Sequence, residues 1–288
     1  MTHAARHGPP SGNDEPRAGA SPLLPDVLAG SVAVAIGGAN VIMQLAQLPI
    51  GHGVAESRVE TGRVDKHPLK RFRTTFTYIA VAAGGSEDER RALRNEVNRA
   101  HRQVRSAADD AVQYDAFDPA QQLWVAACLY RGVELTYRLL YGTPDDATAD
   151  TLYRESARFG TTLQVPASQW PPDRAAFEAY WRRGLASVEM DDATRAYLRR
   201  FAALDFLPTP LRHSLGPVHQ FLATGFLPEP FRSELGLPWS ERRQLAFDVL
   251  TRAGASAVRR LPSPVRAFPF NVLLWDFRSR RAAGRPVV

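Results

Sequence analysis

The most restrictive feature of the sequence is a stretch without Asp, Glu, Lys or Arg that extends from Val27 to Ala55. A run of ~20 apolar residues can span a membrane, so the polar residues inside the stretch decide its environment. Asn40, Gln44 and Gln47 recur at i, i+4 and i+7 and therefore share one helix face. Three amides on one stripe disfavour contact with lipid. We predict that Val27–Ile50 is a buried core helix whose polar stripe faces a cavity or a cofactor.

Composition narrows the class further. The chain has 288 residues, of which 44% are hydrophobic and 23% charged, which is typical of globular proteins. This excludes a largely disordered, collagen-like or polytopic membrane protein. The single cysteine, Cys128, excludes an intramolecular disulfide framework and a cysteine-rich zinc or iron–sulfur site.

The net charge of +6 raises the question of an acidic partner. Arginines are interleaved with acidic residues along the chain, and only Arg278–Arg281 forms a concentrated basic run. We interpret that run as a solvated terminus and expect no nucleic-acid partner.

Proline, glycine and helix-capping residues mark the boundaries of the helices predicted in the rest of the chain. Ser86 to Glu89 matches a capping box, Gly84-Gly85 ends the preceding helix, and Asp118-Pro119 starts a long apolar one. The predicted helices span 67–83, 87–105, 118–141, 145–159, 173–188, 191–204, 240–259 and 270–281, with proline breaks at 207–210 and 227–230. No segment alternates with period two. We predict an all-α fold: a disordered leader over 1–25, one multi-helix domain with a buried cofactor pocket over 26–282, and a tail over 283–288.

Familiar catalytic motifs are absent. The sequence lacks a phosphate-binding loop, a dinucleotide fingerprint, a nucleophile elbow, the His-Glu-x-x-His zinc motif and the Glu-x-x-His pairs of di-iron bundles. An all-α enzyme without these motifs usually depends on a metal, a haem or an acidic cluster.

One histidine differs from the others. His101 follows Leu93 and Val97 at helical spacing, so it is predicted on a buried stripe, either as a hydrogen-bonded core residue or as a metal ligand. His52 lies between two glycines, and His213 and His219 lie among proline-flanked short helices.

The helix over 67–83 carries two stripes. One is apolar, and the other is polar and basic. The apolar stripe comprises Leu69, Phe72, Phe76 and Ile79, and the polar stripe comprises Lys70, Arg73, Thr74 and Thr77. The polar stripe forms either a solvated basic face or the polar wall of a pocket that receives propionates or dioxygen.

Several segments, in order along the chain, resemble an oxygenase family that includes the latex-clearing rubber oxygenases and an ER-bound oxygenase. The segments are Ala39–Ala46, Gly53–Ser57, Lys70–Tyr78, Val97–His101, Tyr114–Val125, Leu163–Pro166 and Phe268–Asn271. The likeness covers residues 27–280, and the order and spacing of the motifs make it specific.

The resemblance implies an all-α domain that binds haem b, with its iron. His101 matches the proximal iron ligand, and Lys70, Arg73 and Thr74 match a basic-x-x-basic-Thr distal motif. Glu56 lies near the position of a catalytic acid. Rubber oxygenases carry Lys where this chain has Arg73. An arginine does not present a free lone pair, so we expect Arg73 to donate hydrogen bonds toward dioxygen or a propionate rather than ligate iron.

We therefore predict a haem-dependent oxygenase that acts with dioxygen on an apolar small molecule or a lipid. The alternative is a non-catalytic haem- or lipid-binding protein with the same fold. No signal peptide is visible, so we expect a cytoplasmic protein, or one peripheral to a membrane without spanning it. A chain inserted in a membrane through Val27–Ile50 is a third interpretation.

Overall fold

The computed structural model describes residues 23–55, 64 and 66–287. Within these residues every regular element is a helix, and one isolated β-bridge joins Arg105 and Asp115, which confirms the predicted all-α class. The elements are α1 (Leu23–Val27), α2 (Gly30–Leu45), α3 (Leu48–Ala55), α4 (Pro68–Gly84), α5 (Glu87–His101), α6 (Pro119–Tyr141), α7 (Asp146–Ser156), α8 (Arg158–Thr161), the 3-10 helix η2 (Ala167–Gln169), α9 (Arg174–Ala186), α10 (Asp192–Ala202), α11 (Thr209–Phe226), α12 (Glu229–Leu235), α13 (Glu241–Arg259), α14 (Ser263–Arg266) and α15 (Phe270–Ala282).

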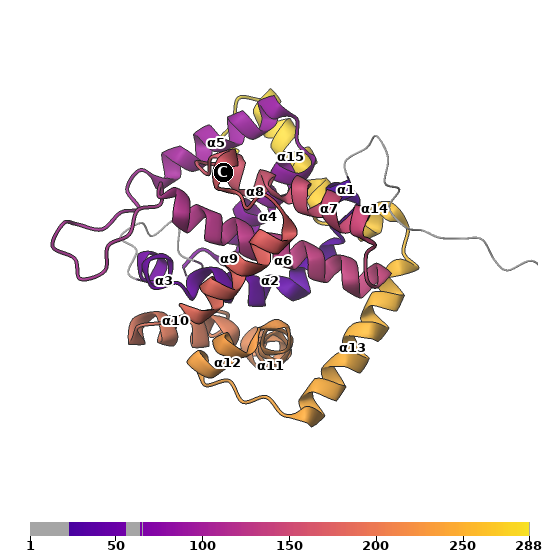
Figure 1. The fold of residues 1–288 in the computed structure, drawn as a ribbon. Helices are drawn as coiled ribbons and strands as arrows, with labels where there is room; N and C mark the ends of the chain where they lie inside the picture. Colours follow the sequence, from indigo (N-terminus) through magenta and orange to yellow (C-terminus); the bar gives the residue numbers. More distant parts are fainter. Residues whose placement is uncertain (1–22, 56–63, 65, 288) are drawn as a thin grey trace, which may run out of the picture.

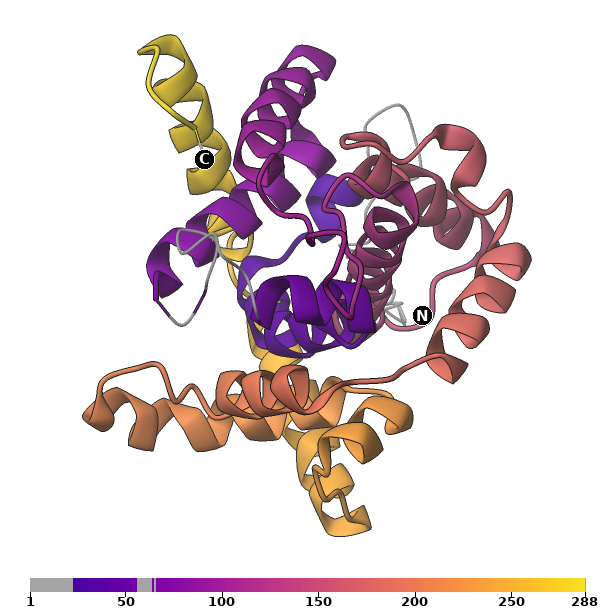
Figure 2. The same ribbon diagram turned by 90° about the vertical axis from the view of Figure 1, so that its left-hand side faces the viewer.

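Helix α2 lies at the centre of the molecule. It packs against α6 and α11, and its side chains Ile36, Ala39, Ile42 and Met43 are buried. Figures 1 and 2 show α10, α11 and α12 as a layer below α2 and α3, with α5 and α15 on the opposite side of the molecule. The uncharged segment is therefore core, as its amides indicated.

Capping residues start several helices where the sequence predicts. Ser86 and Glu89 form a complete capping box at α5. The side chains of Asp118, Asp145, Asp173 and Asp191 accept hydrogen bonds from backbone N–H groups in the first turns of α6, α7, α9 and α10. The acidic pairs at 145–146 and 191–192 thus serve helix starts.

The predicted continuous helix over Val27–Ile50 is wrong. Helix α2 ends at Leu45 and α3 begins at Leu48, with a bend of 106° between them. Pro49 explains the break, because a proline ring clashes with the carbonyl four residues earlier, here that of Leu45. In the described part of the chain no single helix is long and apolar enough to cross a membrane; α2 and α3 satisfy that test only as this bent pair.

Three other boundaries differ from the prediction. The leader was expected to reach residue 25, yet Leu23 and Leu24 belong to α1 and are buried, because hydrophobic side chains there pack into the core. Helix α5 ends at His101 rather than at residue 105. The chain turns after His101, and the backbone N–H of Ser106 donates to the carbonyl of Tyr114. Residues 209–226 form one helix despite the internal Pro217, not several short ones.

Candidate functional site

His101 is the last residue of α5, and its Nδ1 is buried without a hydrogen-bond partner. Of the two apolar residues that predicted the buried stripe, Leu93 is fully enclosed and Val97 is only partly buried. The imidazole is therefore sheltered by what lies around the end of the helix rather than by a continuous apolar face.

The charge beside His101 belongs to Arg71, which the sequence analysis did not select. Burial lowers the pKa of Arg71, and Tyr197 of α10 opposes that shift. No carboxylate of the described residues pairs with this guanidinium. Burial and, second, the positive charge of Arg71 lower the pKa of His101 to about 4. The imidazole is therefore neutral at pH 7, the form in which histidine ligates metals.

The three residues of the predicted distal motif have different surroundings. Lys70 is exposed, and Arg73 lies 3.6 Å from the carboxylate of Asp276 on α15, measured between Nη1 and Oδ2. Thr74 is buried, and its hydroxyl donates to the backbone carbonyl of Arg71 over 3.2 Å. Since residues two apart on a helix point in nearly opposite directions, Arg71 and Arg73 face different neighbours.

The two stripes predicted on α4 differ from the observed burial. Leu69 and Phe72 of the apolar stripe are 84% and 41% exposed, whereas Thr74 and Thr77 of the polar stripe are buried. The Thr77 hydroxyl has no hydrogen-bond partner. Phe76 of the apolar stripe is buried and Lys70 of the polar stripe is exposed, so the departures from the predicted pattern are the exposed Leu69 and Phe72 and the two buried threonines. Glu56, the predicted acid, lies outside the described residues.

An amide network holds the end of α5 against α6. The Gln164 amide donates from Nε2 to Asn98 Oδ1 over 2.6 Å, and Gln122 Nε2 donates to Gln164 Oε1 over 2.6 Å. The backbone N–H of Gln164 completes the set with a 2.8 Å bond to Gln122 Oε1. Asn98 lies one helix turn before His101, so the network fixes the position of the imidazole.

The amide stripe of the core segment has partners within the protein. Asn40 Nδ2 donates to the carbonyl of Cys128 over 2.6 Å, and Gln44 Nε2 donates to Asn40 Oδ1 over 2.6 Å. Gln47 lies beyond the end of α2 and donates to the carbonyl of Gly184 over 3.1 Å. The expectation that this stripe faces a cavity or a cofactor is therefore wrong, because its hydrogen bonds join α2 to α6 and α9.

The sequence analysis also missed a histidine–carboxylate pair. His52 lies in α3, and its Nδ1 is 2.8 Å from Oδ2 of Asp191, the N-cap of α10. Its place between two glycines indicated a flexible position. Asp191 could have been recognised as a cap, but its histidine partner lies 139 residues away and no local pattern indicates it.

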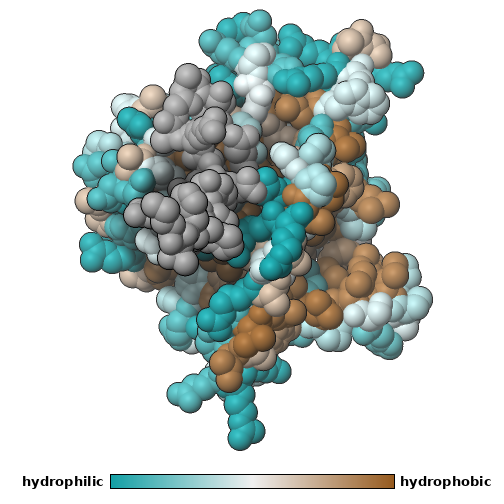
Figure 3. All heavy atoms as spheres, turned by 90° about the vertical axis from the view of Figure 1, so that its right-hand side faces the viewer, coloured by the Kyte–Doolittle hydropathy of each residue, from teal (hydrophilic) through white to brown (hydrophobic). Residues whose placement is uncertain are grey.

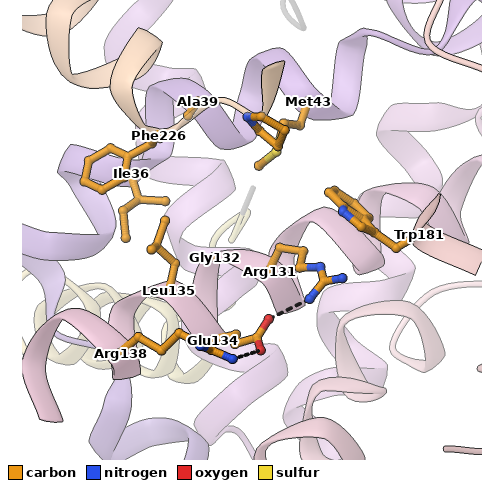
Figure 4. A pocket seen from close by; sticks show the side chains of 11 residues that line it. Ile36, Ala39, Met43, Arg131, Gly132, Glu134, Leu135, Arg138, Trp181 and Phe226 are labelled. Atoms are coloured by element: carbon orange, nitrogen blue, oxygen red, sulfur yellow. Dashed lines mark hydrogen bonds and ion pairs between the residues drawn. The ribbon is translucent and has the colours of Figure 1, made fainter. Parts of the chain in front are cut away.

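The described residues also form two small pockets. One, of about 220 Å³, is lined by Tyr197, Phe201 and Phe206 together with Arg200 and Asp205. The other, of about 190 Å³, lies between α2, α6 and α9 and is shown in Figure 4.

The pocket of Figure 4 has apolar walls and an ionic edge. The side chains of Ile36, Met43 and Trp181 line the apolar part of the pocket. At its edge the Glu134 carboxylate forms ion pairs with the guanidinium groups of Arg131, at 2.7 Å, and Arg138, at 3.1 Å. Arg131 also pairs with Glu178, so two carboxylates surround its charge, while its buried Nε has no partner. The pocket thus offers hydrophobic contact beside a neutralised ionic cluster.

Residues 26–259 match the family described as "ER-bound oxygenase mpaB/B'/Rubber oxygenase, catalytic domain". The chain belongs to this family. The match ends with α13, so α14 and α15 lie beyond it. Uncharacterized proteins of Mycobacterium bovis and Mycobacterium tuberculosis are each 50% identical to the chain over 250 residues, which cover 87% of this chain and 98% of each relative. No solved structure matches the chain.

Membership of the oxygenase family makes His101 the residue of greatest interest. In the described residues no three His, Cys, Asp or Glu side chains gather as a metal site. Haem needs only one protein ligand on its iron, and it carries propionates that pair with cations. The neutral His101 imidazole and the Arg71 guanidinium, which pairs with no described carboxylate, therefore fit haem by their chemistry, whereas Lys70 is exposed and Arg73 pairs with Asp276.

Proposed function

We propose that the protein is a haem-dependent oxygenase that acts on a neutral, mainly apolar molecule. The observation that carries the proposal is the half-buried His101 imidazole, whose Nδ1 is buried without a hydrogen-bond partner and which lies beside Arg71, a guanidinium that pairs with no described carboxylate, in a chain of this oxygenase family. A buried polar atom without a partner is costly, so such atoms often mark a functional position.

The residues around His101 have distinct tasks in this proposal. His101 holds the haem iron, and haem supplies the redox chemistry with dioxygen. The hydrogen bonds among Asn98, Gln122 and Gln164 hold the end of α5 in place. They therefore restrict the movement of His101. Burial and, second, the charge of Arg71 keep the imidazole unprotonated, and Arg71 would donate hydrogen bonds to a carboxylate of the bound cofactor.

The expected role of Arg73 is reassigned in this proposal. Arg73 is paired with Asp276 and faces α15, so Arg71 supplies the positive charge on the His101 side of α4. Thr74, whose hydroxyl is bonded to the Arg71 carbonyl, holds that turn of the helix. The proton donor assigned to Glu56 remains a prediction.

The apolar pocket of Figure 4 is the basis for proposing an apolar ligand, although none of its lining residues belongs to the network around His101. A cavity of ~150 Å³ lined by aliphatic and aromatic groups binds a benzene-sized molecule, and this pocket holds about 190 Å³. Its ionic edge is already neutralised, which favours a neutral molecule over an anion.

The decisive experiment is to compare absorbance spectra and iron content of the wild-type protein with those of His101→Ala and His213→Ala. His213 is an exposed histidine and serves as the control. We expect a Soret band in the wild type and in His213→Ala, and its loss in His101→Ala with unchanged helical circular dichroism. Full haem occupancy in His101→Ala would contradict the ligand assignment.

Dioxygen consumption separates the enzyme from the non-catalytic alternative. The haem-loaded protein should consume dioxygen when it is given small ketones, aldehydes or alkenes. Haem binding without any consumption across such compounds would favour a haem or lipid carrier.

A further inference from the structure

Helix α13 exposes a hydrophobic stripe to solvent. Leu245, Val249 and Leu250 are 62%, 56% and 50% exposed, while Phe247 and Ala255 on the other side of the helix are buried against the body. Leu245 and Val249 recur at i and i+4 and share one face, and Leu250 lies further round the helix, between that face and the buried Phe247. The hydrophobic face of an amphipathic helix normally points inward, and here a second one points outward.

The hydrophobic surface continues beyond α13. Leu261, Val265 and Phe268 are 41%, 54% and 57% exposed in and around α14. Figure 3 shows hydrophobic side chains gathered over the lower part of that face, where Figure 1 places α13, with hydrophilic side chains beside them. We call these six residues the C-terminal apolar surface. Contiguous exposed apolar surface of this kind marks a binding face.

The same region holds the positive charge of the chain. Residues 241–285 contain ten arginines and three acidic residues, a net charge of +7, whereas the whole chain carries +6. The five arginines of α13 and its C-cap are Arg242, Arg243, Arg252, Arg259 and Arg260. None of the five forms an ion pair with a described carboxylate, so their charges are available to a partner.

Charge decides between the partners that could cover this surface. A second copy would bring two surfaces of the same sign together at a symmetric interface, which is unfavourable. A nucleic acid would use the arginines but leave the leucines and Phe268 in water. An anionic membrane uses both, because hydrophobic side chains enter the acyl boundary while arginines meet lipid phosphates.

We propose that the C-terminal apolar surface and the arginines of α13 bind the protein to the surface of an anionic membrane. Helix α13 lies along the membrane plane, with Leu245, Val249 and Leu250 toward the acyl chains. The contact is peripheral, because the helix keeps its opposite face on α6 and α11. This inference does not depend on haem binding and stands or falls separately from the proposed function.

Vesicle sedimentation tests the inference with the full chain. Vesicles of phosphatidylcholine mixed with phosphatidylglycerol should bind the protein, and vesicles of phosphatidylcholine alone should bind it far less. Leu250→Glu should abolish binding, whereas Leu211→Glu on α11 should not; the two leucines are similarly exposed, at 50% and 47%. Circular dichroism should show that both variants remain folded.

A charge variant provides a second, quantitative arm. Replacing Arg252 and Arg260 by Ala should weaken binding to the anionic vesicles roughly thirtyfold, since each surface arginine contributes ~1 kcal/mol. Equal binding to both kinds of vesicle, or no effect of Leu250→Glu, would overturn the inference. So would the absence of vesicle binding together with a dimer that Leu250→Glu dissociates, because the surface would then bind a second copy.

Discussion

Gly38 of α2 lies directly against the imidazole of His219 on α11. A Cβ placed on Gly38 would come within 2.5 Å of His219 Nε2, and the ring cannot turn away freely because its Nδ1 is 2.8 Å from the carbonyl of Ala202. Glycine at this position therefore allows α2 and α11 to approach closely in the centre of the molecule.

The first prediction follows from this contact. Gly38→Ala should lower the free energy of unfolding by about 1–3 kcal/mol, the usual cost of overpacking a core, although alanine is the better helix former. Urea unfolding followed by circular dichroism measures the difference.

Gly254 supplies the matched control. It lies inside α13 with no atom within 4 Å of its added Cβ. Gly254→Ala should therefore raise the free energy of unfolding by about 0.5–1 kcal/mol. Equal effects of the two substitutions would show that the α2–α11 contact is looser than described.

The His52–Asp191 pair predicts a pH dependence. Partial burial acts to raise the pKa of Asp191, but hydrogen bonds from His52 and at Thr194 outweigh it, so the pKa is lowered. A carboxyl whose folded pKa lies below its unfolded value of ~3.9 stabilises the protein above that pH. This stabilisation is lost as the pH falls through the folded pKa.

Asp191→Asn tests this pair without removing the helix cap, since Asn caps as well as Asp. We expect the variant to lose about 1 kcal/mol of unfolding free energy at pH 7, and the loss to shrink as the pH falls below 4. Asp173→Asn, which changes the cap of α9 in the same way, is the control. A pH-independent loss in Asp191→Asn would exclude the electrostatic explanation.

Local signals in the sequence were sufficient for much of the fold. Helix α4 starts at Pro68 and ends at Gly84, and α6 runs from Pro119 to Tyr141, as their prolines, caps and glycines predict. The break before Leu48 was missed although Pro49 was visible, because the uncharged run was treated as one unit. Short helices were predicted between the proline breaks, but residues 209–226 form the single helix α11 even with Pro217 inside it, because packing of α11 against α2 outweighs one lost hydrogen bond.

The candidate site was less predictable, because it depends on long-range contacts. His101 could be selected from spacing and resemblance. Arg71 could not be selected, because it belongs to neither of the two stripes that helix periodicity predicts on α4. The predicted apolar stripe is itself partly exposed. The facing of Arg73 toward Asp276 depends on α15, 203 residues later in the chain.

Glu89 connects α5 with the last helix, α15. Its carboxylate receives hydrogen bonds from Arg278 Nε at 2.7 Å and Nη2 at 3.2 Å, and it also accepts from the Ser86 backbone at 2.8 Å. The hydrogen bond from Arg278 is the main cause that lowers the pKa of Glu89. The link between α5 and α15 should therefore persist at neutral pH and weaken as the pH falls through that lowered pKa.

Glu89→Gln should loosen α15 while preserving the capping box, which accepts Gln at this position. Hydrogen exchange should become faster in α15 and stay unchanged at the start of α5. The control is Glu87→Gln, which affects an exposed carboxylate that pairs only locally with Arg91. Unchanged exchange in α15 would show that its packing on α4 alone holds it.

The last prediction concerns the buried amides of α2. Gln44 donates to Asn40 Oδ1, and Asn40 donates to the carbonyl of Cys128 on α6, each over 2.6 Å. Gln44→Leu leaves the Asn40 acceptor buried without a partner, and it should cost about 1–3 kcal/mol of unfolding free energy although leucine is more hydrophobic.

A double-mutant cycle isolates the hydrogen bond from the change in packing. Asn40→Ala alone leaves the Gln44 amide without its acceptor, whereas Asn40→Ala with Gln44→Leu removes both partners at once. The double variant should therefore be less destabilised than the sum of the two single variants, by about 1 kcal/mol or more. Additive losses would mean that the two amides do not interact, and that shape alone holds α2 against α6. Because both residues lie on the helix at the centre of the core, the coupling energy also measures how far polar contacts, rather than hydrophobic burial, fix the position of α2.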